Sequence, residues 1–238
     1  MRVLGLDSSG LVASVAVVED DNLLAEYTVN YKKTHSQTLL PMLDEVTKMT
    51  QLDLNTIDAI AVSSGPGSFT GLRIGSATAK GLGLALKKTL IPVPTLDALA
   101  YNLYDHKDII CPIMDTRRNQ VYTGIYTFED HKMQTQLNSC ALDIKELAEQ
   151  LNTLGKELEK QIVFLGDGVA VYKEVLKECL EVPYSFAPAH CNKQRASAVA
   201  ALGILYAEEG KTVTAAEFQP DYLRKSQAER EREEREKS

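Results

Sequence analysis

The sequence contains no tryptophan, and aromatic residues make up only 6% of its 238 residues. Proteins that bind single-stranded nucleic acid usually stack its bases on aromatic side chains, so this composition disfavours such a platform. Positive charge is also scarce, since 26 Lys and Arg residues against 33 Asp and Glu residues leave a net charge of −7. Affinity for phosphate backbones depends on cationic side chains. We therefore expect nucleic-acid binding only with a local basic patch or with a partner that supplies one.

Paired cysteines and long apolar runs are missing too. The four cysteines are scattered, with neither a C-x-x-C pair nor a Cys-His cluster at zinc spacing. The opening stretch MRVLGLDSSG reaches an acid too early for the apolar core of a secretory signal. No stretch approaches the roughly 18 apolar residues of a membrane span. We expect a reduced, cytoplasmic protein without membrane contact, whose cysteines are small core residues.

What the sequence does contain is an alternation of strand and helix periodicity that occurs twice. In the first half, three strands precede a helix, a strand, a second helix and a short strand. These predicted elements are strands 2–7, 11–18, 23–30, 57–63 and 91–93, and helices 36–49 and 71–87. A helix at 96–104 leads to the second half. There, we predict strands 109–114, 121–128, 162–165 and 184–187, a further strand after the turn 129–132, and helices 144–151, 169–180 and 196–209.

The repeated order predicts an α/β fold of two related lobes, each a mixed sheet with flanking helices. We place the N-terminal lobe at residues 1–98, completed by 212–227, and the C-terminal lobe at residues 99–211. Each copy opens with a strand ending on an acid, Asp7 in LGLDSSG and Asp115 in CPIMDTRRN. Since ligands of α/β sheets favour the carboxyl ends of strands, Asp7 and Asp115 should face each other across a cleft. Nucleotide-dependent enzymes of the actin, Hsp70 and sugar-kinase superfamily share this architecture.

The chain ends in a charged tail, residues 228–238, with the sequence AEREREEREKS. Acidic and basic residues alternate there and nearly neutralise each other, which makes the tail a poor phosphate-binding arm. We expect a solvated, frayed helix supported by weak ion pairs.

The most distinctive motif is SGPGSFTGLRIG at residues 64–75, which follows a predicted strand and opens a helix. Exposed backbone N–H groups at a helix start form a natural anion site. The motif is not a Walker loop, because no Gly-Lys-Ser/Thr follows. Two interpretations stay open: a phosphate-binding turn, or a tight strand-to-helix turn with Ser68 or Thr70 as the helix cap.

The helix after this motif has a face with almost no side chains. Glycine inside a helix costs roughly 1 kcal/mol relative to alanine, so three on one face indicate a close contact with another backbone. The preceding helix is the natural neighbour, and its methionines suit an adaptable interface. Internal packing of both helices is the equal alternative. The small residues are Gly71, Gly75, Ala79 and Gly83, and the exposed face of the neighbour would carry Met42 and Met49.

Several enzyme classes lack their signature. His35 opens the first helix, but the position four residues later is Leu39, so a metal site of the H-x-x-x-H type is unsupported. No serine lies in a G-x-S-x-G elbow. Asp7 and Asp115 could hold magnesium only if nucleotide phosphates completed the shell. Gly166-Asp167-Gly168 fits close backbone approach to a nucleotide or a simple turn. We expect no metal site and no cofactor.

Several motifs together resemble the TsaB (YeaZ) family, bacterial proteins needed for threonylcarbamoyladenosine modification of tRNA. The resemblance covers nearly the whole chain except the charged tail. Its most specific part is SSGPGSFTGLRIG followed by AKGLGLAL. The weaker parts, in chain order, are LGLDSS, HSQTLLPMLDEV, MDTRRNQVYTGIY, FLGDGV and PDYLRKS.

The resemblance implies an actin-like, Hsp70-like (ribonuclease H-like) fold and the role of a noncatalytic scaffold or activator subunit. In the family, the paralogue TsaD transfers threonylcarbamoyl from its adenylate to the adenosine following the anticodon, and the ATPase TsaE joins the complex. TsaD holds a metal with an H-x-x-x-H pair, of which this chain has only His35. The tRNA would be met only through the complex, and the chain alone could form a homodimer.

The resemblance also assigns roles to residues. In the family, the helix pair forms a bundle with the partner or with a second copy. The predicted partner-binding residues are Leu39, Met42, Leu43, Val46, Met49, Gly71, Arg73, Gly75, Ala79 and Gly83. The predicted vestigial nucleotide-binding residues are Asp7, Ser8, Ser9, Gly67, Asp115, Gly166 and Gly168.

The alternative function is an ATP-dependent kinase or ATPase of the actin-like superfamily. It would use Asp7, Asp115, Gly67 and Gly168 around Mg-ATP, although Ser8-Ser9 replaces the expected D-x-G. A standalone peptidase ranks below it because the second metal ligand is missing. A standalone tRNA binder is disfavoured by the charge.

Overall fold

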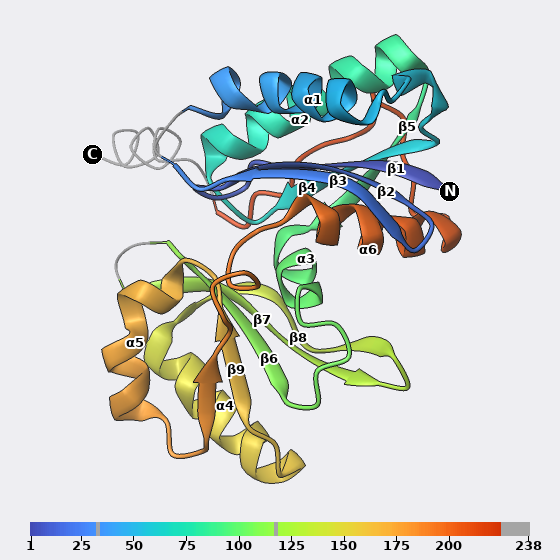
Figure 1. Ribbon diagram of the computed structural model, residues 1–238. Coiled ribbons are helices and arrows are strands. Elements are labelled where there is room, and N and C mark those ends of the chain that lie inside the picture. Colours follow the sequence, from blue (N-terminus) through green and yellow to red (C-terminus); the bar gives the residue numbers. More distant parts are fainter. Residues whose placement is uncertain (32–33, 117–118, 225–238) are drawn as a thin grey trace, which may run out of the picture.

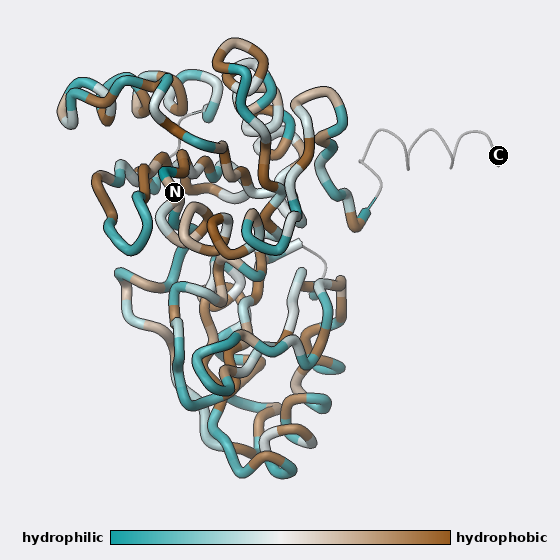
Figure 2. The backbone as a smooth tube through the Cα atoms, turned by 90° about the vertical axis from the view of Figure 1, so that its right-hand side faces the viewer, coloured by the Kyte–Doolittle hydropathy of each residue, from teal (hydrophilic) through white to brown (hydrophobic). Residues whose placement is uncertain are grey.

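The structure, a computed structural model, describes residues 1–31, 34–116 and 119–224. The described chain folds into two lobes, each built on a five-stranded sheet (Figure 1). Hydrophobic segments concentrate in the strands and hydrophilic ones in the connecting loops (Figure 2). The charged tail lies outside the described residues, and no helix within them is long and apolar enough to cross a membrane.

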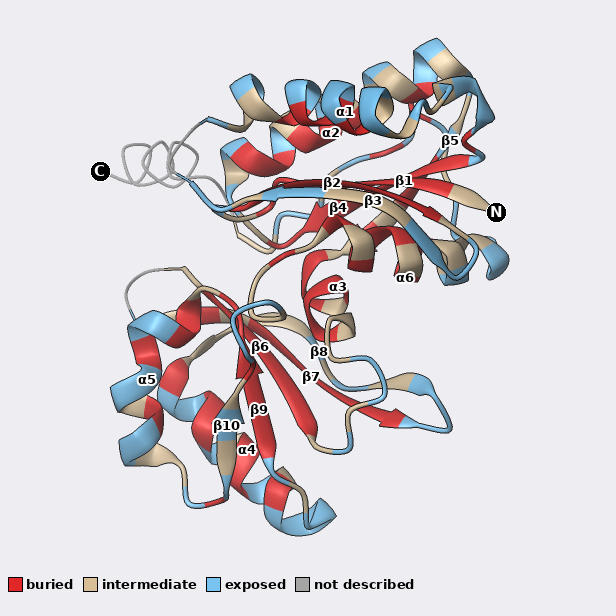
Figure 3. Cartoon of the chain, viewed as in Figure 1, coloured by how far each residue is buried: buried red, intermediate tan, exposed pale blue. Residues whose placement is uncertain are grey.

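The sheet of the N-terminal lobe has the strand order β3-β2-β1-β4-β5. Strands β1 (Arg2–Asp7), β2 (Ala13–Glu19) and β3 (Asn22–Val29) are antiparallel, whereas β4 (Ala59–Gly65) and β5 (Thr89–Pro94) run parallel to β1. Strands β1 and β4 are buried almost throughout, as expected for strands covered on both faces (Figure 3). Because these two strands are parallel neighbours, their carboxyl ends meet at one edge of the sheet.

Helices cover both faces of this sheet. Helices α1 (His35–Thr50) and α2 (Phe69–Leu86) lie side by side on one face, and α6 (Ala196–Glu208) lies on the other. A short 3-10 turn, η1 (Leu54–Thr56), leads from α1 into β4. Helix α2 begins after Ser68, whose hydroxyl oxygen accepts a hydrogen bond from the Gly71 N–H at 3.3 Å. The SGPGSFTG motif is therefore a capped strand-to-helix turn.

The C-terminal lobe repeats this connectivity. Its sheet has the order β10-β9-β6-β7-β8, with an antiparallel meander of three strands followed by two parallel strands. The strands are β6 (Ile109–Asp115), β7 (Gln120–Glu129), β8 (Lys132–Asp143), β9 (Ile162–Leu165) and β10 (Tyr184–Phe186). The predicted fold class, two related lobes of the actin-like type, is confirmed.

Three further helices complete the molecule. Helices α4 (Ile144–Leu158) and α5 (Gly168–Cys179) pack on one face of the second sheet. The connecting helix α3 (Thr95–Tyr101) packs on its other face. Helix α3 ends earlier than its periodicity predicts, and the side-chain amide of Asn102 instead donates to the carbonyls of Cys191 and Lys193. Helix α4 continues about two turns beyond its predicted end, since Leu151 and Gly155 remain on its buried face.

The predicted lobe boundary is wrong at its C-terminal side. Helix α6 lies within the range 99–211 assigned to the C-terminal lobe, yet Val199 and Leu202 join the core of the N-terminal sheet. The chain after α6 stays in the same lobe: Val213 bridges Leu90 of β5, and Phe218 is buried in the N-terminal core. The C-terminal lobe therefore ends before α6.

Helix α6 is anchored to β3 by a carboxylate at its start. Glu26 accepts hydrogen bonds from the backbone N–H and hydroxyl of Ser197, at 3.1 and 2.7 Å, and pairs with the guanidinium of Arg195. An acid at this end of a helix also interacts favourably with the helix dipole. Burial alone would raise the pKa of Glu26, but the bonds from Arg195 and Ser197 outweigh it and lower the pKa below its ordinary value.

Replacing Glu26 by glutamine should therefore destabilise the protein in a pH-dependent way. A carboxyl group with a lowered pKa in the folded state stabilises above its unfolded pKa and loses this contribution as pH falls. We expect Glu26→Gln to lower the free energy of unfolding by about 2 kcal/mol at pH 7. The difference from the wild type should shrink as pH falls below the ordinary value of 4.5. Urea unfolding of both proteins between pH 7 and pH 3 checks this, and a constant difference would contradict it.

Candidate functional site

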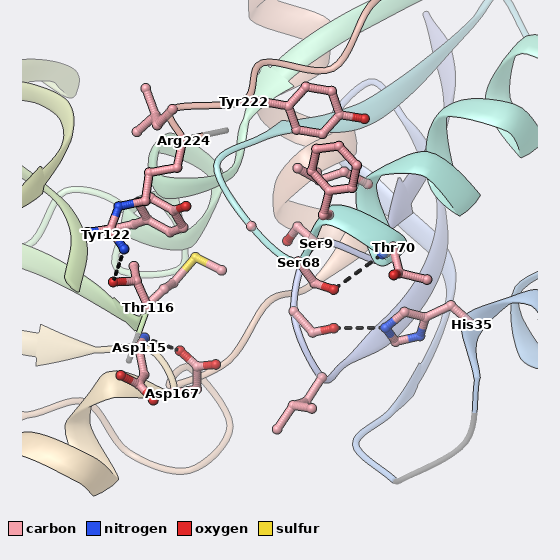
Figure 4. A pocket seen from close by; sticks show the side chains of 18 of the residues that line it. Ser9, His35, Ser68, Thr70, Asp115, Thr116, Tyr122, Asp167, Tyr222 and Arg224 are labelled. Atoms are coloured by element: carbon pink, nitrogen blue, oxygen red, sulfur yellow. Dashed lines mark hydrogen bonds between the residues drawn. The ribbon is translucent and has the colours of Figure 1, made fainter. Parts of the chain in front are cut away.

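A cleft of about 590 Å³ lies between the two lobes (Figure 4). One wall comes from the loops after β1 and β4 and from the start of α1, and it includes Ser9, Ser68 and His35. The other wall comes from the end of β6 and the turn before α5, and it includes Asp115 and Asp167. The fold thus places strand ends of both lobes at one cleft, as the repeated sequence pattern predicts.

Asp7 does not reach this cleft. Its side chain is only 1% exposed and is enclosed by hydroxyl groups of its own lobe. One carboxylate oxygen accepts the backbone N–H and hydroxyl of Ser9, both at 2.8 Å, and the other accepts the hydroxyl of Ser63 at 2.5 Å. Burial raises the pKa of Asp7, although these hydrogen bonds oppose that rise. The prediction that Asp7 faces Asp115 across the cleft is therefore wrong, because Ser9 lies between Asp7 and the open space.

Asp115 does line the cleft. Its carboxylate accepts a hydrogen bond from the Tyr172 hydroxyl at 2.9 Å, and its backbone N–H donates to Asp167 at 3.2 Å. Burial, together with the bond to Asp115, raises the pKa of Tyr172 to about 12. Burial also raises the pKa of Asp167, and the nearby charge of Asp115 adds to that rise. This wall presents two acids, and the opposite lobe contributes Asp221 to the lining of the cleft in place of Asp7.

The glycines predicted to approach a nucleotide instead leave room for carbonyl oxygens of the protein's own backbone. A Cβ atom at Gly67 would overlap the carbonyl oxygen of Ser9, and one at Gly166 would overlap that of Ile113. Gly168 also packs against the Ile113 carbonyl, where a Cβ would lie 2.9 Å away. Of these three, Gly67 borders the cleft. Two of the three glycines assigned to nucleotide approach therefore fill a tight turn inside the C-terminal lobe.

Ser8 likewise points into its own lobe. Its hydroxyl donates to the Gly71 carbonyl at 2.9 Å, which fastens the end of β1 to the start of α2. His35 shares this region, with its Nε2 2.8 Å from the Gly10 carbonyl (Figure 4). The residue one turn later, Leu39, is buried in the hydrophobic core. His35 therefore has no second metal ligand on its helix.

The predicted contact surface of α1 is wrong for most of its residues. The helix has apolar residues at the spacing of a single stripe, and that stripe packs on the protein's own sheet. Met49 is the exception, with 76% of its surface exposed. The buried residues of this stripe are Leu39, Met42, Leu43 and Val46.

The predicted small-residue stripe of α2 is wrong for the same reason. A Cβ at Gly71 would overlap the Ser8 carbonyl oxygen, and one at Gly75 would lie 2.5 Å from the Ser8 hydroxyl. Gly83 faces Leu90, and Ala79 is fully buried in the core. The close backbone contact that these residues require is made within the chain. The substitution Gly75→Leu should consequently destabilise the N-terminal lobe itself, so a loss of partner binding in this variant would not identify an interface.

Helix α2 carries a second small-residue stripe on its opposite, exposed side. Ala77, Gly81 and Ala85 follow one another at four-residue intervals, and all three are exposed. A Cβ at Gly81 would meet no atom within 4 Å. Leu84, which is 69% exposed, borders this stripe. We call these four residues the exposed face of α2.

Arg73 lies one turn before this stripe and is exposed as predicted for a contact residue. Its guanidinium carbon lies 4.1 Å from the centre of the Phe69 ring. The Phe69 ring also contacts Tyr222, with 4.4 Å between the two ring centres. At the start of α2, the exposed face of the helix therefore adjoins a cation held over one of two contacting rings.

Three comparisons place this structure among known proteins. The family model of TsaD, tRNA N6-adenosine threonylcarbamoyltransferase, matches residues 22–232. TsaB of Bacillus subtilis, a tRNA threonylcarbamoyladenosine biosynthesis protein, is 30% identical over 96% of both chains. TsaB of Escherichia coli is 28% identical over 96% of both chains. The solved structure of YeaZ from Pseudomonas aeruginosa has a TM-score of 0.79 and 25% identity, covering 93% of this chain and 99% of that one.

The fold and the family model together define a two-lobed, actin-like protein related to the TsaD transferases. Full-length identity to the bacterial biosynthesis proteins narrows this class. The chain belongs to the TsaB (YeaZ) family.

Proposed function

We propose that this chain is a noncatalytic scaffold or activator subunit in the synthesis of threonylcarbamoyladenosine in tRNA. The TsaD paralogue would be the catalyst, transferring threonylcarbamoyl from its adenylate to the adenosine following the anticodon. The ATPase TsaE would join the complex, and this chain would contact tRNA only as part of that complex. We place this activity in the cytoplasm.

The observation that carries this proposal is the exposed face of α2. It combines exposed small residues, which permit close approach of a foreign helix, with the exposed apolar side chain of Leu84 beside them. A helix of a partner can pack into such a groove through its own apolar ridge. The same face could join two copies of the chain when the paralogue is absent.

The cleft supports the noncatalytic part of the proposal. Nucleotide hydrolysis in a two-lobed cleft needs carboxylates that face bound metal and phosphate, and Asp7 is enclosed by Ser9 and Ser63. Asp115 and Asp167 remain on the other wall. They are the observation in favour of the rival function, an ATP-dependent kinase or ATPase.

Reconstitution of tRNA modification tests the proposal. With TsaD, TsaE, threonylcarbamoyl-adenylate and tRNA present, adding this chain should raise the rate of product formation at least about tenfold, because a positioning subunit acts on the catalyst's geometry. The chain alone should form no product and hydrolyse no ATP. ATP turnover by the purified chain that is lost in Asp7→Ala would instead favour the ATPase, and an unchanged rate would contradict the activator role.

A further inference from the structure

The segment Asp221–Arg224 runs from the N-terminal lobe across the mouth of the cleft to the C-terminal lobe (Figure 4). At its start, the Asp221 N–H donates to the Ser64 carbonyl of β4 at 2.6 Å. At its end, the Arg224 guanidinium donates to the Thr116 hydroxyl, just after β6, at 3.1 Å. The segment therefore connects the parallel strand of one lobe to the opening strand of the other.

Between these two ends, the segment is held by helix α2. Tyr222 stacks on Phe69, the first residue of α2, at a tilt of 32°. Phe69 in turn lies beneath the guanidinium of Arg73. Arg73 is exposed and forms no ion pair within the part of the chain that the structure describes. A continuous row of contacts thus leads from the surface of α2 to the far wall of the cleft.

A separate set of bonds joins the lobes at helix α3. The carboxylate of Asp97 accepts the hydroxyl of Tyr126 from the C-terminal sheet and that of Tyr206 from α6, both at 2.7 Å. Neither of these tyrosines nor Asp97 lines the cleft. The lobes are consequently joined at α3, and the segment at the mouth makes a second connection through the half-exposed Tyr222 ring and the part-buried Arg224–Thr116 bond. This connection has fewer bonds between side chains than the one at α3, so it is the more readily exchanged.

We propose that residues 221–224 act as a latch that holds the cleft at its present width, controlled from helix α2 through Arg73 and Phe69. Removing the cation from the Phe69 ring weakens the stack with Tyr222, and the Arg224–Thr116 bond then opens more often. An acidic group that binds Arg73 would have the same effect. This inference concerns the chain by itself, so it goes beyond the proposed function and does not depend on any partner.

Hydrogen exchange of the full-length chain tests the latch. The measured quantity is the exchange rate of the backbone amides of residues 114–116, which lie in the C-terminal lobe, across the cleft from α2. Arg73→Ala should speed exchange there about threefold, the effect of losing an exposed cation–ring contact. Arg73→Lys, which keeps a cation over the ring, should restore most of the protection. Unchanged exchange at 114–116 in Arg73→Ala would overturn the coupling.

A second measurement uses the absence of tryptophan from the chain. Tyr222→Trp creates a single fluorophore within the latch, and quenching by acrylamide reports how often it is released. In this background, Arg224→Ala and Thr116→Val should each raise the quenching constant. Arg224→Ala should have no further effect once Thr116 is valine, because the bond between these two side chains is then already lost. Thr116→Val also removes the bond from the hydroxyl to the Gln120 carbonyl, whereas Thr116→Ser keeps the hydroxyl and should behave like the parent. Additive effects, or no effect of Arg224→Ala, would overturn the latch.

Discussion

Alanine at Gly71 is expected to destabilise the N-terminal lobe severely, whereas alanine at Gly81 of the same helix should stabilise it. At Gly71 the added methyl group would overlap the backbone carbonyl of Ser8, which cannot move without displacing the end of β1. Overpacking of a rigid site costs about 3 kcal/mol. For a chain of this size, that corresponds to a melting temperature lower by about 10 °C.

At Gly81 the added methyl group would enter open space. The substitution removes only the conformational cost of glycine inside a helix, a gain of up to about 1 kcal/mol. Thermal unfolding followed by circular dichroism measures both variants, with the wild type as reference. Equal melting temperatures for Gly71→Ala and Gly81→Ala would contradict the assignment of one small-residue stripe to the interior and the other to the surface.

The two small-residue stripes of α2 also show what the sequence pattern does not predict, namely which stripe is exposed. Gly71, Gly75, Ala79 and Gly83 have the same four-residue spacing as Ala77, Gly81 and Ala85, so spacing alone does not identify the exposed one. Close contact is correctly predicted for the three glycines of the first set, but it is made with Ser8, Lys88 and Leu90 of the same chain and not with a foreign helix. A usable indication was present in the sequence. Arg73 continues the register of the second stripe by one turn and thereby marks the solvent side.

The fold itself is predicted well because its evidence is distributed along the chain. Period-two and helical patterns occur in the same order twice, and an error at one boundary leaves that order intact. The position of α6 could not be predicted in this way. Its residues are apolar on nearly all sides, and buried alanines such as Ala196 and Ala200 give no preferred face. Which sheet such a helix covers depends on tertiary contacts such as the bonds of Glu26.

The position of the cleft was predicted correctly, but not which acidic side chains line it. Strand-end acids of two related lobes approach one cleft by topology, and Asp115 behaves as this rule predicts. Asp7 differs because two serines, Ser9 and Ser63, provide donors close enough to enclose its carboxylate. Ser63 lies 56 residues away in the sequence, so the enclosing bond follows only from the parallel pairing of β1 and β4.

Aspartate at Leu84 should strongly weaken the proposed complex with the TsaD paralogue while leaving the chain folded. Leu84 is exposed beside Gly81, so a charge there costs the free protein only about 1 kcal/mol in helix propensity and helix-dipole interaction. In a packed interface the same charge would lose its water without gaining a partner, which weakens binding by about 3 kcal/mol or roughly a hundredfold in Kd. Isothermal titration and size-exclusion chromatography with the purified paralogue measure this effect.

Val171→Asp is the matched control, since Val171 is an exposed apolar residue on α5 of the other lobe, 57% accessible. It should bind the paralogue as the wild type does.

Gly81→Leu distinguishes two ways in which the exposed face of α2 could contact the paralogue. If a foreign helix approaches the α2 backbone closely, a bulky side chain at Gly81 should block binding as strongly as Leu84→Asp. If Leu84 merely fills a distant pocket, Gly81→Leu should bind normally. Normal binding by Leu84→Asp together with loss of binding by Val171→Asp would move the contact surface to the C-terminal lobe.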